Sequence, residues 1–88
     1  MKKISIAVDN GVGLHARPAS QFVERAKRFQ SDIRVVSESG TANAKSILNI
    51  LSLGITKGTE ITILATGPDE KEALAELCDL INGRFGEE

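Results

Sequence analysis

Two kinds of hydrophobic periodicity alternate along the chain, and this alternation restricts the folds that it can adopt. Apolar residues recur at every second position in Lys2 to Val8, Asp32 to Glu38 and Thr59 to Thr66, as in half-buried strands. Two longer segments have the helical spacing instead, through Ala19, Phe22, Val23 and Ala26 and through Leu74, Leu77, Cys78 and Ile81. Each helix therefore needs a sheet face to cover, and each strand offers only one such face.

Two shorter segments complete the predicted order. Thr41 to Ala44 is expected to form a short third strand, and the apolar turn after Ser46 is expected to be a short helix ending near Gly54. The order is then strand, helix, strand, strand, helix, strand, helix. The sequence predicts an α+β open-faced sandwich, in which three helices cover one face of a four-stranded antiparallel sheet.

The length and composition allow one domain, residues 1–88, and exclude several classes of partner. The chain has no Trp or Tyr and a formal net charge of −1. Few aromatic side chains are available to stack on bases, and the chain has no net positive charge to attract a polyanion. Nucleic acid is therefore not an expected partner. Any anion site must be local.

The sequence also predicts the compartment. Cys78 is the only cysteine, so it forms no disulfide within the chain, and its place in an apolar helical stripe predicts a buried thiol. The N-terminal apolar stretch is interrupted by Ser5 and Asp9, which is unlike a signal peptide. No apolar run is long enough to span a bilayer, so we expect a cytoplasmic protein without membrane insertion.

The segment GVGLHARPAS, residues 11–20, places the only histidine, His15, directly before an expected helix. Pro18 suits a first helical turn, where its missing N–H would have no intrahelical acceptor. The N–H groups of Ala16 and Arg17 then remain free at the positive end of the helix dipole. Arg17 also adds a permanent cation, so these groups together are expected to hold a phosphoryl group placed on His15.

Imidazole suits reversible phosphoryl transfer. A ring with an ordinary pKa of about 6.5 is largely neutral near about pH 7 and has an unprotonated nitrogen that attacks phosphorus. The bond formed is easily broken again, because the ring is a fair leaving group. The residues alone also allow His15 to be a plain helix cap. A metal site has no ligand spacing, and a hydrolase using Ser20 lacks a GxSxG elbow.

GLHARPAS resembles the active-site signature of the histidine-containing phosphocarrier (HPr) family of the bacterial phosphoenolpyruvate-dependent sugar phosphotransferase system. KSILNILSLGITKG resembles the signature of the same family around its regulatory serine, and the likeness covers essentially all 88 residues. The resemblance implies that His15 accepts a phosphoryl group on Nδ1 from phosphorylated enzyme I and passes it to a sugar-specific IIA domain or protein. Arg17 would assist by charge, and no metal or organic cofactor is expected.

Ser46 has two interpretations. GTANAKS, from Gly40 to Ser46, looks like a nucleotide-binding loop, but its second glycine is missing and its lysine stands one place early, so nucleotide binding is not expected. Ser46 is expected to cap the short helix. The resemblance implies that it is also the target of a regulatory kinase, and both roles remain open.

The short helix is too small to bury all of its sides, so part of its apolar surface is expected to stay exposed while Ile50 is core. The resemblance implies that enzyme I and IIA dock on this exposed part and on the neighbouring first helix, using Ser20, Lys27, Ile47, Leu48 and Leu51. Two features depart from the common family pattern. Glu24 occupies a position that is often basic, and Ser39-Gly40 replaces a frequent Gly-Lys turn, which leaves the partner preference open.

The sequence therefore predicts a monomeric phosphocarrier that has no turnover of its own, because the catalysis resides in its partners. The alternatives are a regulatory binding module controlled by Ser46, with a kinase or phosphorylase and a transcription regulator as partners, and a carrier of a nitrogen-related branch. The sequence identifies neither the branch nor the particular IIA partner.

Overall fold

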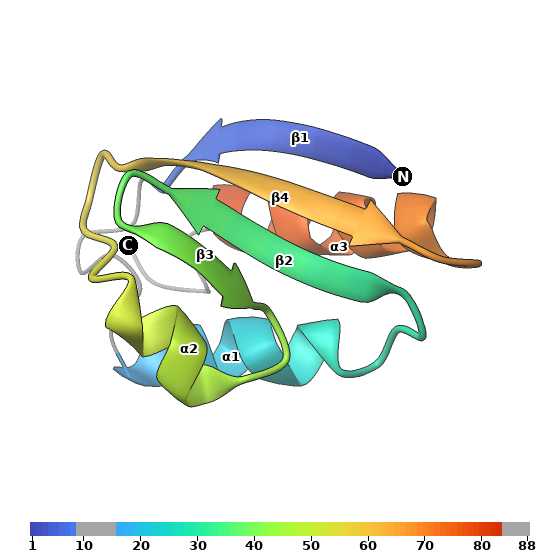
Figure 1. Ribbon diagram of the computed structural model, residues 1–88, viewed down its shortest axis with the longest axis horizontal. Coiled ribbons are helices and arrows are strands. Elements are labelled where there is room, and N and C mark those ends of the chain that lie inside the picture. The colour runs from blue at the N-terminus through green and yellow to red at the C-terminus, as the bar shows by residue number, and fades with distance from the viewer. Residues whose placement is uncertain (9–15, 84–88) are drawn as a thin grey trace.

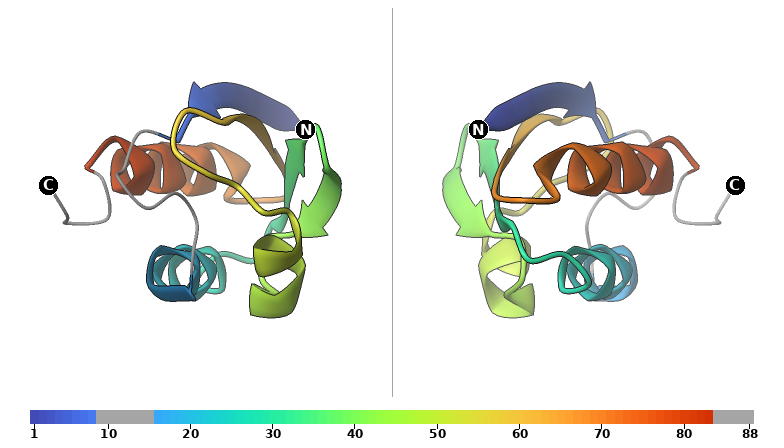
Figure 2. Two further views of the ribbon diagram at one scale, coloured as in Figure 1. Left: turned by 90° about the vertical axis from the view of Figure 1, so that its left-hand side faces the viewer. Right: turned by 90° about the vertical axis from the view of Figure 1, so that its right-hand side faces the viewer.

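The computed structural model describes residues 1–8 and 16–83. The elements along the chain are β1 (Lys2–Ala7), α1 (Ala16–Ala26), β2 (Asp32–Ser37), β3 (Gly40–Asn43), α2 (Ile47–Ser52), β4 (Glu60–Thr66) and α3 (Glu70–Asn82). The four strands form one antiparallel sheet in the order β1-β4-β2-β3, and the three helices lie on one side of it (Figures 1 and 2). The predicted open-faced sandwich and its element order are confirmed.

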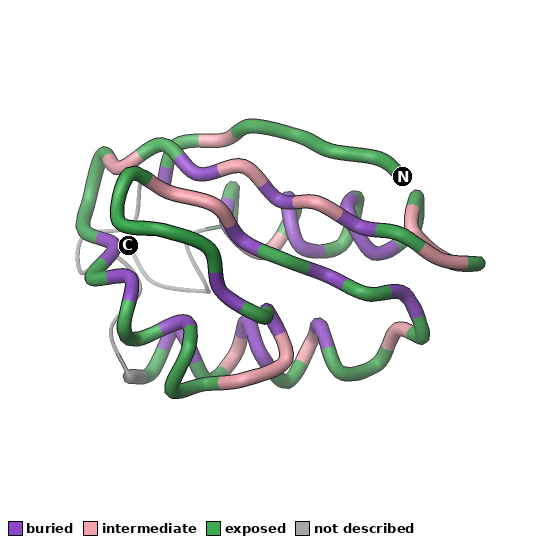
Figure 3. Tube along the Cα trace, in the orientation of Figure 1, coloured by how far each residue is buried: buried purple, intermediate pink, exposed green. Residues whose placement is uncertain are grey.

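The two central strands, β2 and β4, supply most of the sheet's contribution to the core. Val35 pairs with Ile63, and Ile33 pairs with Ala65, so that the buried positions of the two strands form adjacent rows. Because side chains alternate along a strand, the positions between them face away from the helices. Figure 3 shows this alternation, with buried positions separated by exposed or intermediate ones along both central strands.

The alternation in the first strand predicts one buried face with Ile4, Ile6 and Val8, and β1 differs from this prediction. Its pairing with β4 sets Ile4 beside Ile63 and Ile6 beside Ile61, so both side chains are on the helix side of the sheet. However, Ile4 is 40% exposed and Ile6 is half-buried, and only Val8, beyond the end of the strand, is fully buried. β1 is an edge strand with one neighbour, so its side chains are covered from fewer directions.

The helical pattern that runs through Ala19 and Ala26 predicts a first helix ending near Phe29, but the helix ends earlier. α1 stops at Ala26 rather than near Phe29, and the chain continues in a turn in which the Phe29 N–H donates to the Ala26 carbonyl at 3.2 Å. Phe29 still packs against the core, which explains why its apolar character extended the helical pattern. The segment Asp9-Asn10-Gly11 predicts a turn after the first strand, and these residues lie outside the described ones.

Glu72 stands three residues after Asp69, and this spacing predicts a capping box at the start of α3, but the prediction is wrong. Asp69 stands at the N-cap position, but its side chain makes no capping hydrogen bond. Its carboxylate instead accepts from the backbone N–H groups of Gln30 and Ser31, both at 2.9 Å, and from the Ser31 hydroxyl. Asp69 therefore ties α3 to the loop between α1 and β2, and a helix pattern cannot reveal a partner so distant in sequence.

This tie predicts an acid-dependent loss of stability. The hydrogen bond from the Ser31 hydroxyl and those from the backbone of Gln30 and Ser31 lower the pKa of Asp69. A pKa that is lower in the folded state stabilises the fold above the unfolded pKa, and this stabilisation is lost as the pH falls through the folded value. We expect the melting temperature of the wild type to fall more than that of Asp69→Asn between about pH 5 and about pH 3.

Thermal melts across this pH range measure the difference. The pKa of Glu70 is also lowered, first by the hydrogen bond from the Gly67 N–H, so Glu70→Gln must be measured to separate its share. Parallel pH profiles for the wild type and Asp69→Asn would show that the Asp69 tie does not respond to protonation.

Candidate functional site

The candidate site is built on the N-terminus of α1. His15 itself lies outside the described residues, but α1 begins at the next residue, Ala16. The first turn of α1 contains no acidic residue, and Arg17 is exposed there. The first turn of α1 therefore combines the positive end of the helix dipole with the cationic residue Arg17, and no carboxylate in that turn opposes them.

Buried residues fix this end of α1 in place. Pro18 is fully buried in the first turn, where the lack of an N–H costs no intrahelical hydrogen bond. Ala19, Phe22 and Ala26 have no exposed surface, and Val23 is 3% exposed. The stripe predicted from the sequence is thus the face that α1 buries in the core. The helix terminus that follows His15 is anchored by the core.

Ser46 is the N-cap of α2, as predicted. Its backbone is extended at φ −120° and ψ 115°, and its hydroxyl oxygen accepts from the Asn49 N–H at 3.4 Å. The preceding turn is closed by the Ser46 N–H, which donates to the Asn43 carbonyl at 3.1 Å. Ser46 is half-buried, so part of the residue remains accessible. The capping role is confirmed, while modification by a kinase stays a prediction.

α2 exposes the apolar residues that were assigned to docking. Ile50 is fully buried, whereas Leu48 is 75% exposed, Ile47 37% and Leu51 36%. α2 packs directly against α1, and the two helices lie side by side at the same end of the molecule (Figures 1 and 2). The predicted division of α2 between core and exposed surface is confirmed.

The first helix and the turn after it also expose polar and basic residues. Arg17, Ser20 and Lys27 are exposed, with Lys27 just beyond the end of the helix. We call these three residues together with Ile47, Leu48 and Leu51 the α1–α2 surface. It combines an apolar patch with cations, so it suits a partner surface that is both apolar and acidic.

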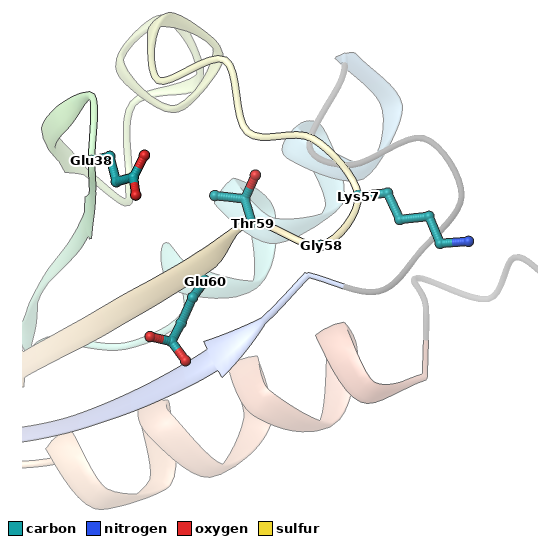
Figure 4. A pocket seen from close by; sticks show the side chains of 5 residues that line it. All are labelled: Glu38, Lys57, Gly58, Thr59 and Glu60. Atoms are coloured by element: carbon teal, nitrogen blue, oxygen red, sulfur yellow. The ribbon is translucent and has the colours of Figure 1, made fainter.

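Neither of two hollows in the described part of the molecule is centred on the α1–α2 surface. The larger, of about 520 Å³, lies where β4 begins and is lined by Glu38, Lys57, Gly58, Thr59 and Glu60 (Figure 4). The Lys57 side chain points away from the two glutamates. The smaller, of about 240 Å³, lies along α1 and is lined by Ser20, Gln21, Glu24, Arg25 and Arg28. Only Ser20 is shared with the predicted docking residues.

Residues 1–8 and 16–83 also bear on the requirements of a metal site, a reactive thiol and a membrane span. No group of three His, Cys, Asp or Glu residues is placed there to hold a metal ion. Cys78 is buried, as predicted, and burial raises the pKa of its thiol, with a further contribution from Asp79. Across the same described ranges, no helix has both the length and the apolar character of a membrane span.

One residue beside the site was not predicted from the sequence. The Lys45 ammonium donates to the Phe29 carbonyl at 2.7 Å and so connects the turn before α2 with the turn after α1. A lysine in a polar turn usually points into solvent, and nothing in the hydrophobic pattern distinguishes this one. Only the tertiary arrangement of α1 and α2 reveals the contact.

Comparisons with known proteins identify the family. The PTS-HPr family model, described as the PTS HPr component phosphorylation site, matches residues 2–83. Phosphocarrier protein HPr of Neisseria meningitidis serogroup B is 44% identical over 87 residues, covering 99% of this chain and 98% of that protein. The HPr of Vibrio cholerae is 47% identical over 81 residues, covering 92% of this chain and 93% of that protein.

Solved structures agree with this relationship. The crystal structure of HPr-C-His from Thermoanaerobacter tengcongensis matches with a TM-score of 0.97 at 48% identity, covering 100% of this chain and 99% of that chain. A crystal structure of an HPr dimer from the same organism matches with a TM-score of 0.79 at 47% identity, covering 99% of this chain and 100% of that chain. Sequence and fold agree over nearly the whole length, and the chain therefore belongs to the HPr family of phosphocarrier proteins.

Proposed function

We propose that this protein carries phosphoryl groups on His15, accepting them on Nδ1 from phosphorylated enzyme I and passing them to a IIA component of the sugar phosphotransferase system. The observation that carries the proposal is the start of α1 immediately after His15, on a terminus held by the buried Pro18 and Ala19. Membership of a family described by its phosphorylation site supports the same assignment.

The chemistry is a displacement at phosphorus. The neutral imidazole forms a bond to phosphorus while the bond between phosphorus and the donor enzyme breaks, and the electron pair of that bond leaves with the donor. The backbone N–H groups of Ala16 and Arg17, the dipole of α1 and the Arg17 guanidinium stabilise the phosphoryl charge. Transfer to IIA reverses these steps with a new acceptor, so the protein needs no resident cofactor and performs no net reaction alone.

Partner docking is assigned to the α1–α2 surface. Leu48 and its neighbours Ile47 and Leu51 provide the apolar contact, and Arg17 and Lys27 provide complementary charge for an acidic partner. The exposed Glu24 opposes this charge on the same helix and is a candidate for tuning partner preference. The cytoplasmic location and the monomeric state stay predictions, and relatives of known structure include an HPr dimer.

The test is phosphorylation by purified enzyme I with labelled phosphoenolpyruvate. The proposal requires a labelled protein whose phosphate is labile in acid and stable in base, as expected for a phosphohistidine. A IIA protein added afterwards must take up the label. A protein that stays unlabelled with an active enzyme I would contradict the carrier function and would favour a regulatory module. IIA proteins of the sugar and nitrogen-related branches, compared as acceptors, distinguish the two branches.

A regulatory role for Ser46 predicts the effect of Ser46→Asp. Aspartate is as good an N-cap as serine, and its charge is favoured at a helix N-terminus, so the fold should be as stable or slightly more stable. The added charge stands beside Ile47 and Leu48, where an acidic partner must approach and desolvate. We expect kcat/KM for transfer from enzyme I to fall by a factor of about 5 to 30, equivalent to about 1–2 kcal/mol.

Ser46→Ala is the matched control, because it removes the capping hydroxyl without adding charge. It should lower the unfolding free energy by about 1 kcal/mol and leave transfer intact. Rates at two ionic strengths and thermal melts measure both variants, and the defect of Ser46→Asp should be larger at low salt. If Ser46→Ala slowed transfer as much as Ser46→Asp, loss of the cap rather than charge would explain the effect.

A further inference from the structure

The contact between Lys45 and Phe29 joins the two helices that form the α1–α2 surface. Lys45 is half-buried, and its ammonium lies 2.7 Å from the Phe29 carbonyl oxygen. Phe29 follows the last turn of α1, where the negative end of the helix dipole favours a cation. Lys27, on the α1–α2 surface, is two residues before Phe29. The contact is thus close in sequence to both parts of that surface, because Phe29 follows Lys27 by two residues and Lys45 precedes Ile47 by two residues.

The other anchors of α2 connect it to the core and the sheet. Ile50 is the only buried residue of the described helix α2. Before the helix, Ala44 is buried and its N–H donates to the Ile33 carbonyl of β2 at 2.9 Å; after it, Leu53 is 5% exposed. A six-residue helix with one buried side chain has few contacts that fix its orientation relative to a neighbouring helix.

Lys45 provides a polar contact between the turn before α2 and the turn after α1. Among the residues that the structure describes, its bond to Phe29 is the only hydrogen bond between segments 16–30 and 44–54. Packing between α1 and α2 brings the helices together, but apolar contacts are not directional. A short hydrogen bond to a backbone carbonyl is directional, so it holds the turn before α2 at a fixed position relative to the turn after α1.

We infer that Lys45 is a positioning residue for partner docking, which holds the apolar patch of α2 in register with the basic residues of α1. This inference rests on the proposed function, in which enzyme I docks on both helices together through a surface that complements their apolar and basic residues. Without the link, α2 can shift relative to α1, and the partner must restore the arrangement when it binds. The apparent affinity for the partner is then the intrinsic affinity multiplied by the fraction of molecules in the competent arrangement.

The effect should fall on binding rather than on chemistry. Lys45 precedes α2, whereas the groups proposed to stabilise the phosphoryl group are on the first turn of α1, so loss of Lys45 leaves them unchanged. We expect Lys45→Met, which keeps the apolar stem and removes the donor, to raise the KM for this protein with enzyme I by about 5- to 20-fold. The kcat should stay within about twofold of the wild type.

Two further variants make the experiment specific. Lys45→Arg retains a cationic donor and should recover most of the wild-type KM. Lys71→Met removes an exposed lysine from α3, outside the α1–α2 surface, and should leave KM unchanged. All variants are compared at a temperature at which circular dichroism shows them fully folded, so that unfolding does not contribute to the measured KM.

The salt dependence separates positioning from direct contact with the partner. A lysine that meets an acidic partner directly would, when removed, reduce the dependence of KM on ionic strength, whereas a positioning lysine leaves that dependence as in the wild type. A reduced dependence, or an unchanged KM in Lys45→Met with a normally labelled wild type, overturns this inference alone. Failure of enzyme I to label the wild type overturns the proposed function and this inference with it.

Discussion

The substitution His15→Ala is expected to abolish phosphoryl acceptance from enzyme I while the protein remains folded. His15 is the only histidine in the chain, so no second imidazole can replace it. The residues that fix α1 immediately after it, Pro18 and Ala19, are buried and unchanged in the variant. Any loss of stability should therefore be limited to that of a helix-capping position, at most about 1 kcal/mol.

The measurement is incorporation of labelled phosphate with enzyme I and phosphoenolpyruvate, with a thermal melt of the same sample. Arg17→Ala is the companion variant. It should still be labelled, more slowly, because the backbone donors and the helix dipole remain to hold the phosphoryl group. Acid-labile label retained by His15→Ala would exclude His15 as the carrier, and an unchanged rate in Arg17→Ala would leave its guanidinium without a part in transfer.

The largest effect on stability is expected from Gly67→Ala. Gly67 has φ +152°, and an added Cβ would lie 2.6 Å from the Ser31 Oγ and 2.7 Å from the Ser31 Cα. Ser31 is buried and held by Asp69, so neither its backbone nor its side chain can move away without breaking that tie. We expect a loss of about 2–5 kcal/mol from backbone strain and overpacking together. The melting temperature should fall by roughly 10–30 °C.

Gly40 provides a closely matched control. Its φ is +141°, but an added Cβ there has no neighbour within 4 Å. Gly40→Ala should therefore show only the backbone cost of about 1–2 kcal/mol. Denaturant unfolding of both variants isolates the contact with Ser31 as the difference between them. Equal losses in the two variants would mean that the chain accommodates a side chain at Gly67 by a small local shift.

Predictions from the sequence were most accurate for features that depend on residues within one helix or strand. The alternation in Ile61 and Ile63 predicted β4, and the spacing of Phe22, Val23 and Ala26 predicted the buried face of α1. These patterns work because a strand or helix imposes its periodicity on the face that it buries. The cap formed by Ser46 was predictable for the same reason, since its partner Asn49 is three residues away.

Predictions failed where an interaction depends on a distant segment. Asp69 has the spacing of a helix cap, but Gln30 and Ser31 occupy its carboxylate oxygens. Ile4 belongs to a regular strand pattern, but its exposure is set by the position of β1 at the sheet edge. Strand order and loop contacts arise from the packing of the whole chain, so the pattern of one segment does not contain them.

The sequence motif and the structure identify different residues of the candidate site. The HARP motif identified His15, which lies outside the described residues, and the exposure of Leu48 agrees with a docking patch expected from the short second helix. The link from Lys45 to Phe29 had no signal in either motif. Chemistry that one residue performs can be predicted from its neighbours in sequence, whereas the relative placement of two helices requires the fold.

The sheet order has a consequence for synthesis on the ribosome. β4 is the last strand to be made, yet it lies between β1 and β2 and joins them. While the chain ends before Glu60, β2 and β3 can pair as a hairpin, but β1 has no strand beside it to accept its hydrogen bonds. The sheet can close only when β4 has left the exit tunnel. Until most of the protein has been translated, the apolar residues of β1 in a nascent chain must therefore stay in solution or be shielded by other factors.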